Sequence, residues 1–96
     1  MSGPVRAVLT MAVPPARAEE FELAWKQVAS WAREQPGCLR QSLCVVDGAY
    51  VITSDWSDEE SFRRFERSPE QDERTAGLRR LRTSARMEVQ RILHHH

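Results

Sequence analysis

The first apolar segment of the chain covers residues 5–13, which are apolar or small except for Arg6 and Thr10. An apolar run of this length is typical of a buried or half-buried strand. Pro14 and Pro15 follow directly, and a pair of prolines interrupts the strand. The pattern therefore predicts a first strand that ends before Pro14.

From residue 16 the apolar residues recur at the spacing of one helical face. Acidic residues near the start suit the positive end of the helix dipole, and Pro36 with Gly37 ends the segment. The pattern predicts an amphipathic helix with Trp31 at the edge of its apolar face. That face is formed by Phe21, Ala24, Trp25, Val28 and Ala32.

Residues 38–46 and 49–56 alternate with the period of a strand. Asp47 and Gly48 between them are a two-residue sequence that favours a hairpin turn. On residues 38–46, one face carries Leu39, Gln41, Leu43 and Val45, and the other carries Arg40, Ser42 and Cys44. On residues 49–56, one face carries Tyr50, Ile52, Ser54 and Trp56, and the other carries Val51, Thr53 and Asp55.

Ser57 begins a capping-box sequence, because Glu60 follows three residues later. This sequence predicts a second helix, with Phe62 and Phe65 on its apolar side. Pro69 restarts the helix, which continues to about residue 81. Basic residues near its end are interpreted as a solvated surface with internal ion pairs: Arg74, Arg79, Arg80 and Arg82. Residues 85–93 alternate again and form a final strand.

The predicted order is β-α-β-β-α-β, the ferredoxin-like α+β arrangement. It gives a four-stranded antiparallel sheet with helices on one face. Since no element covers the other face, we expect a homodimer in which two sheets pack together. A monomer with a solvated face is the alternative, because antiparallel sheets tolerate one. Residues 1–93 form a single domain, and His94, His95 and His96 resemble the remnant of an expression tag.

Composition argues against two classes of partner. The formal net charge is zero and the pI is about 6.8, without the basic excess typical of a nucleic-acid-binding protein. No apolar run approaches the roughly 18 residues of a membrane span. The first residues lack the layout of a signal peptide, so we expect a cytoplasmic protein that binds neither nucleic acid nor membrane.

The natural domain contains no histidine, since all three histidines lie in the terminal run. This excludes histidine-ligated haem, a histidine-containing zinc site and histidine-activated nucleophiles, and we expect no metal or cofactor. Cys38 and Cys44 on one strand would lie about 20 Å apart. A disulfide requires Cα atoms within about 7 Å, so both thiols are expected to be reduced.

Three short motifs carry a family resemblance: P-G-C-L at residues 36–39, W-S-D-E-E-S-F at 56–62, and S-P at 68–69. With them the chain, from about residue 5 to residue 92, resembles the antibiotic biosynthesis monooxygenase (ABM) domain family of dimeric α+β barrels. That family contains cofactor-free oxygenases that convert anthrones or phenols to quinones, haem-degrading enzymes and quinol oxygenases. Haem-degrading members use a histidine ligand that this chain lacks.

The resemblance implies an enzyme, a cofactor-independent monooxygenase that acts with dioxygen on a polycyclic aromatic intermediate of polyketide or antibiotic biosynthesis. An alternative is a cyclase or isomerase of the same barrel superfamily. A further alternative is a non-catalytic dimeric domain that binds a ligand or assists a partner enzyme.

Four residues are candidate catalytic groups. The Trp56 indole would stack on a flat substrate and donate to its oxygen, while Tyr50 would orient or deprotonate a phenol. Arg40 or Arg86 would stabilise an enolate or phenolate oxygen. Apolar residues expected around the substrate are Trp25, Trp31, Ile52, Phe62, Phe65 and Cys44. Core packing is the alternative for these side chains.

Overall fold

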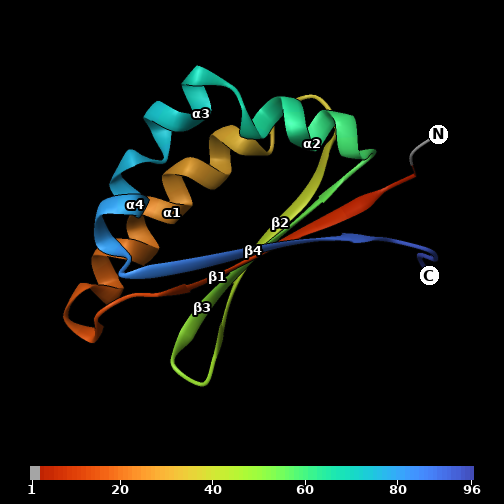
Figure 1. The fold of residues 1–96 in the computed structure, drawn as a ribbon. Helices are drawn as coiled ribbons and strands as arrows, with labels where there is room; N and C mark the ends of the chain where they lie inside the picture. Colours follow the sequence, from red (N-terminus) through yellow and green to blue (C-terminus); the bar gives the residue numbers. More distant parts are fainter. Residues whose placement is uncertain (1–2) are drawn as a thin grey trace.

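The computed structural model describes residues 3–96, which form an antiparallel sheet with helices on one face (Figure 1). The elements are β1 (Val5–Ala12), the short 3-10 helix η1 (Pro15–Arg17), α1 (Ala18–Ala32), β2 (Cys38–Val46), β3 (Ala49–Trp56), α2 (Glu59–Glu66), α3 (Pro69–Arg74), α4 (Ala76–Leu81) and β4 (Ser84–Arg91). The strand order is β2-β3-β1-β4. The predicted ferredoxin-like α+β fold is therefore confirmed.

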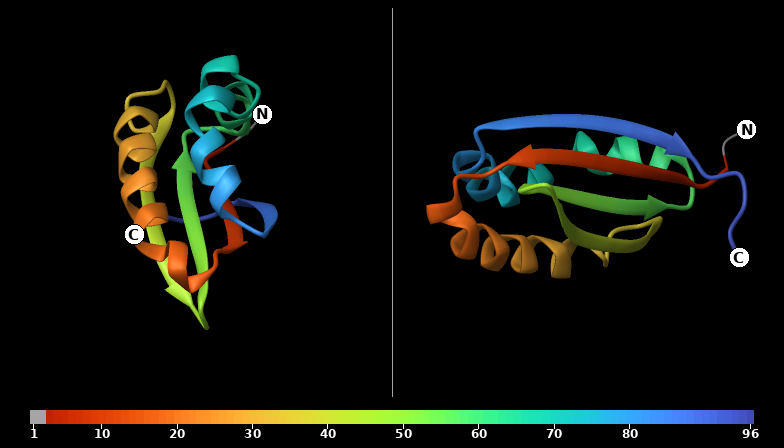
Figure 2. Two further views of the ribbon diagram at one scale, coloured as in Figure 1. Left: turned by 90° about the vertical axis from the view of Figure 1, so that its left-hand side faces the viewer. Right: turned by 90° about the horizontal axis from the view of Figure 1, so that it is seen from below.

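The second helical segment differs from the prediction in two ways. Asp58, rather than Ser57, caps α2, because its Oδ1 accepts a hydrogen bond of 2.7 Å from the Ser61 N–H. The segment after it consists of two short helices, since α3 ends at Arg74 and α4 begins at Ala76. All four helices cover the same face of the sheet. On that face α1 lies along one side, and α2, α3 and α4 lie along the other (Figure 2).

The turn between β2 and β3 has the predicted two-residue form. Asp47 and Gly48 both have positive φ angles, 50° and 79°, and Val46 pairs with Ala49 on either side of them. Positive φ at both central residues matches the right-handed twist of the flanking strands. The turn thereby fixes the register that brings Gln41 opposite Ser54.

Gly37 lies in the connection between α1 and β2 and packs against the start of α2. Its φ is 88°, and a Cβ at this position would lie 2.5 Å from the Ser61 Cβ. Its carbonyl oxygen accepts a hydrogen bond of 2.8 Å from the Ser57 N–H. A side chain is thus excluded at residue 37, where the chain enters β2 beside the end of β3.

The buried apolar residues form two clusters between sheet and helices. One contains Val5, Ala7, Trp56 and Phe62, and the other contains Met11, Val13, Phe21 and Leu78. Members of both clusters also line the cavity described below, which lies between them.

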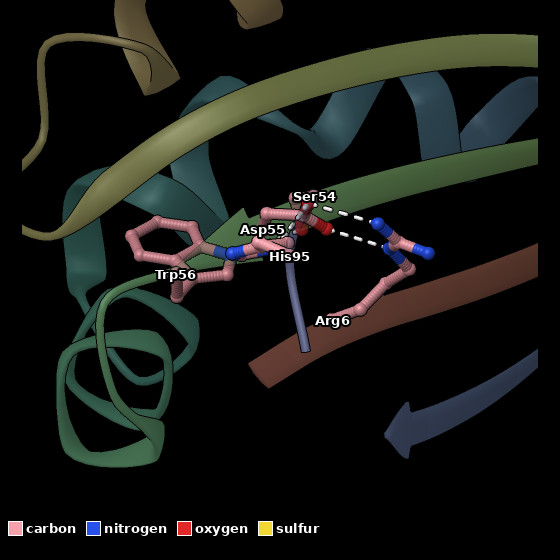
Figure 3. Close-up of polar contacts among 5 residues, drawn as sticks. All are labelled: Arg6, Ser54, Asp55, Trp56 and His95. Carbon is pink, nitrogen blue, oxygen red and sulfur yellow. Dashed lines mark hydrogen bonds and ion pairs between the residues drawn. The ribbon is translucent and has the colours of Figure 1, made fainter. Parts of the chain in front are cut away.

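An ion pair lies on the sheet face that the helices leave uncovered. Arg6 donates two hydrogen bonds to the Asp55 carboxylate, of 2.7 and 3.0 Å (Figure 3). Asp55 is 3% exposed, and the Arg6 guanidinium holds the pKa of its carboxyl below the usual value. His95 of the tag-like terminus lies 4.0 Å from the same carboxylate.

Candidate functional site

A cavity of about 350 Å³ lies between the sheet and the helices. Its floor comes from all four strands, and its walls come from α1 on one side and from α2, α3 and α4 on the other. Cavities of this size are suited to a small organic ligand. Its apolar lining includes Ala7, Leu9, Met11, Trp25, Val28, Ile52, Phe62, Phe65, Leu78 and Met87.

Aromatic rings form much of the wall near α2. The Phe65 ring lies 4.8 Å from the Trp56 ring and 5.5 Å from the Trp31 ring, measured between centroids. Trp56 also packs on Phe62, at 5.8 Å. Phe62 and Phe65 face the cavity, whereas the two tryptophans stand behind them. Such rings offer flat, rigid surfaces against which an aromatic ligand can pack.

Trp56 is fully buried and does not line the cavity. Its Nε1–H donates a hydrogen bond of 3.0 Å to the Ser54 Oγ (Figure 3). Ser54 does line the cavity. The sequence prediction that Trp56 itself faces the substrate is therefore corrected: the indole reaches the cavity through Ser54.

Gln41 stands beside Ser54 on the cavity floor, because the two residues are paired across β2 and β3. The Gln41 side chain makes one weak contact, from Nε2 to the Cys38 Sγ at 3.9 Å. Burial raises the pKa of Cys38, which keeps this thiol neutral. Ser54 and Gln41 form an uncharged polar pair on an otherwise apolar floor.

Two arginines lie at the end of the cavity near α4. Arg79 is held by Asp72, with 3.3 Å between its Nη2 and the Asp72 Oδ1. Arg82 donates to the Met11 Sδ at 3.7 Å, and within residues 3–96 no carboxylate pairs with it. Burial and the nearby Arg79 charge lower the pKa of Arg82. A guanidinium is basic enough to stay charged despite this lowering, so Arg82 offers a cation to a ligand.

Of the six residues predicted to surround the substrate, four line the cavity: Trp25, Ile52, Phe62 and Phe65. Tyr50 does not. Its hydroxyl donates a hydrogen bond to the Glu22 carboxylate, and its ring stacks on Phe21 at 4.9 Å. The hydrogen bond to Glu22 raises the pKa of Tyr50, which is opposite to what a base requires.

The other predicted residues also lie outside the cavity. Arg40, Cys44 and Arg86 point to the uncovered face, since neighbours of cavity-facing residues on a strand point the opposite way. Trp31 lies at the outer edge of α1, where the Arg74 guanidinium covers its ring at 4.9 Å. The structure therefore corrects the expected placement of these four side chains.

The polar groups that do face the cavity were not singled out from the sequence. Alternation predicts that Gln41 shares a face with Leu43 and that Ser54 shares a face with Trp56, but it does not indicate which face the helices cover. The sequence carries no signal for Arg82, because it lies in a group of arginines interpreted as a solvated surface. In the structure Arg82 follows the last residue of α4 with ψ of 148°. This extended conformation leaves the helix and turns toward β1.

In the part of the chain that the structure describes, no group of three His, Cys, Asp or Glu side chains is arranged to hold a metal ion. No helix within residues 3–96 is long and apolar enough to cross a membrane.

Comparisons with known proteins agree on one fold. A Caulobacter crescentus protein described as an antibiotic biosynthesis monooxygenase superposes on this chain with a TM-score of 0.87 at 20% identity. The superposition covers 97% of this chain and 92% of that protein. SnoaB, a cofactor-independent oxygenase from Streptomyces nogalater, has a TM-score of 0.84 at 27% identity, covering 97% and 96%. Rv0793 from Mycobacterium tuberculosis has a TM-score of 0.82 at 17% identity, covering 97% and 98%.

The comparison with curated protein sequences found no significant match. The family profile described as "Antibiotic biosynthesis monooxygenase" (ABM) matches residues 4–74, which is most of the chain and includes the cavity residues of β1, α1, β2, β3 and α2. On this match the chain belongs to the antibiotic biosynthesis monooxygenase family.

Proposed function

We propose that the protein is a cofactor-independent monooxygenase that oxidises a polycyclic aromatic ketone or phenol to a quinone, as a step of polyketide or antibiotic biosynthesis. The observation that carries the proposal is an aromatic-walled cavity with an unpaired guanidinium, Arg82, at one end. The 27% identity to SnoaB, a cofactor-independent oxygenase, supports the same chemistry.

For an anthrone, the reaction consumes one dioxygen and releases one water. Loss of a proton from the ring CH₂ gives an enolate, whose oxygen carries the charge. The enolate transfers an electron to dioxygen, and the resulting carbon radical and superoxide combine to a peroxide anion on that carbon. The peroxide anion takes back one proton, equivalent to the one lost in the first step, and becomes a hydroperoxide. Loss of water from the hydroperoxide leaves the quinone. The substrate supplies the electrons, so the protein has to stabilise the enolate and hold it in a dry site.

The chain's own residues suit these two tasks. The Arg82 guanidinium stabilises the enolate oxygen, and this lowers the free energy needed to release the proton to water. Trp25, Phe62 and Phe65 exclude water from the ring system. Glu66, the carboxylate at the cavity wall, is held by Arg63 at 3.0 Å and stays an ion-pair partner.

The test is dioxygen uptake with anthrone as substrate, compared with product formation under argon. The proposal predicts uptake of one dioxygen per quinone in air and no product under argon. Cyclisation or isomerisation of an added polyketide under argon would instead favour the cyclase alternative. Tight binding of the aromatic without turnover would favour a non-catalytic binding domain.

The same proposal includes a homodimer in which a second copy covers the uncovered sheet face. That face carries charges of both signs, including Arg40 and Arg86 against Glu88. A twofold interface brings one patch onto itself, so a face with both signs can pair opposite charges across it. Light scattering after size-exclusion chromatography tests this: a mass of about one chain contradicts it.

A further inference from the structure

The cavity floor carries polar groups at two separate places. Ser54 pairs with Ala7 on β1, whereas Arg82 contacts Met11 on the same strand. Four residues along a strand span about 13 Å. Between them the floor is apolar, with Leu9 paired to Ile52. A ligand that satisfies both places is elongated, and it carries oxygen at each end.

The Ser54 hydroxyl is directed by its neighbour. Indole is only a donor, so the 3.0 Å bond from Trp56 Nε1 occupies an acceptor position on Ser54 Oγ and leaves the hydroxyl proton to donate elsewhere. Within residues 3–96 that proton has no acceptor. Ser54 is 8% exposed and lines the cavity, which is where an acceptor can reach it. Accepting one hydrogen bond also strengthens the bond that a hydroxyl donates.

Gln41 completes the site. It is the cross-strand neighbour of Ser54 and faces the same cavity, and its single contact to Cys38 Sγ is weak. No charged group belongs to this pair, in contrast to the arginine end. An uncharged pair with donors suits a neutral oxygen, such as a carbonyl or an un-ionised phenol.

We propose that Ser54 and Gln41 bind a neutral oxygen at one end of an elongated polycyclic ligand whose ionised oxygen is bound by Arg82, and that Trp56 positions the Ser54 hydroxyl. The inference rests on the proposed function and deepens it. It defines the substrate class as polycyclic phenols with oxygen at both ends of the long axis. Anthrone, whose single oxygen lies on its central ring, presents that oxygen to Arg82 and leaves Ser54 and Gln41 without a partner. Ser54 and Gln41 contact the ligand, while Trp56 acts only through Ser54.

The test uses two stable quinones that differ in one terminal hydroxyl, 2,6-dihydroxyanthraquinone and 2-hydroxyanthraquinone, with affinities from titration calorimetry. The wild-type protein is expected to bind the dihydroxy compound about tenfold more tightly. Ser54→Ala should reduce this preference to about threefold or less, and Gln41→Leu should reduce it independently of Trp56. Ser42→Ala, the same change on the uncovered face, should leave it at the wild-type value.

A double-mutant cycle tests the role of Trp56. In the wild-type background, Trp56→Phe should weaken the preference for 2,6-dihydroxyanthraquinone over 2-hydroxyanthraquinone. In the Ser54→Ala background, the same change should have no further effect on this preference. An indole that binds the ligand directly would give additive effects instead, which would overturn its assignment as a positioning residue. Circular dichroism of each variant shows whether it is folded.

The outcomes separate this inference from the proposed function. Binding of both quinones with the same preference in wild type, Ser54→Ala and Gln41→Leu overturns the site while leaving the oxygenase proposal standing. Failure of the wild-type protein to bind either quinone, together with no dioxygen uptake on anthrone, overturns both.

Discussion

The Trp56 indole N–H donates to the Ser54 hydroxyl over 3.0 Å, while Asp55 between them points to the opposite face of the sheet. The alternation of one strand therefore places a buried hydrogen bond on the cavity side and the Arg6 ion pair on the other. Trp56, the first residue of the W-S-D-E-E-S-F motif, contributes to packing and to the orientation of a neighbour. Its effects on stability and on binding can be measured separately.

Trp56→Phe is expected to lower the free energy of unfolding by about 1–3 kcal/mol, because it removes a buried hydrogen bond and leaves a void among fully packed rings. Urea denaturation followed by circular dichroism measures the change. The control is Trp31→Phe at the half-exposed edge of α1, where the expected loss is below about 1 kcal/mol. Equal losses at both positions would contradict the proposed packing.

Two glycines with similar backbone angles allow a matched comparison. Gly37→Ala should destabilise by about 2–4 kcal/mol, since its Cβ would meet Ser61 at 2.5 Å in addition to the strain of a positive φ. Gly48→Ala has the same strain with no atom within 4 Å, and should lose only about 1 kcal/mol. Thermal or urea unfolding of the two variants measures the free energy of unfolding that each has lost. Equal losses in the two variants would show that Gly37 does not pack on Ser61.

Much of the fold follows from local signals in the sequence. The Asp47 and Gly48 turn and the alternation on either side of it predict β2, β3 and which residues of each strand share a face. Alternation did not predict that the faces with Gln41 and Ser54 are the ones that the helices cover. Nor did it predict their pairing with a specific neighbour, because a hydrogen bond such as that from Trp56 to Ser54 depends on side-chain rotamers.

The candidate site was predicted less well, for a physical reason. Tyr50 and Trp56 do point to the helical side of the sheet, but Phe21 and Glu22 of α1 cover the tyrosine and α2 covers the tryptophan. Which inward residue remains open depends on how the helices sit, and periodicity does not contain that information. Arg82 is the opposite case: it belongs to a cluster predicted to lie on the surface, but it turns toward the cavity after α4 ends.

Arg82→Gln is expected to lower kcat/KM for anthrone oxidation by about a hundredfold, because an oxyanion loses its only unpaired cation in the described cavity. Stability should change little, since the guanidinium has no carboxylate partner to lose within residues 3–96. Dioxygen uptake and thermal unfolding give the two quantities. Arg80→Gln, on the exposed side of α4, is the control and should retain wild-type activity.

Tyr50→Phe should leave the rate of oxidation and its pH dependence unchanged. The hydroxyl is bonded to Glu22 outside the cavity, and its raised pKa opposes a role as a base. The expected stability change is below about 1 kcal/mol, the usual value for an exposed hydrogen bond. A pH–rate profile of the variant is the measurement. If the variant's pH–rate profile lost its alkaline limb, Tyr50 would take part in the reaction, and its placement outside the cavity would be contradicted.

Asp55→Asn should lower stability by about 1–3 kcal/mol near neutral pH, because Asp55 is 3% exposed and accepts two hydrogen bonds from Arg6. Arg6 lowers the pKa of Asp55 in the folded protein. The stabilisation is therefore fully present above the unfolded pKa of about 3.9 and is lost as the pH falls through the lower folded value. Urea denaturation of both proteins between about pH 2 and 7 measures this. The wild-type advantage should shrink steadily below about pH 4, and an advantage that stays constant to pH 2 would show that the Asp55 charge contributes nothing.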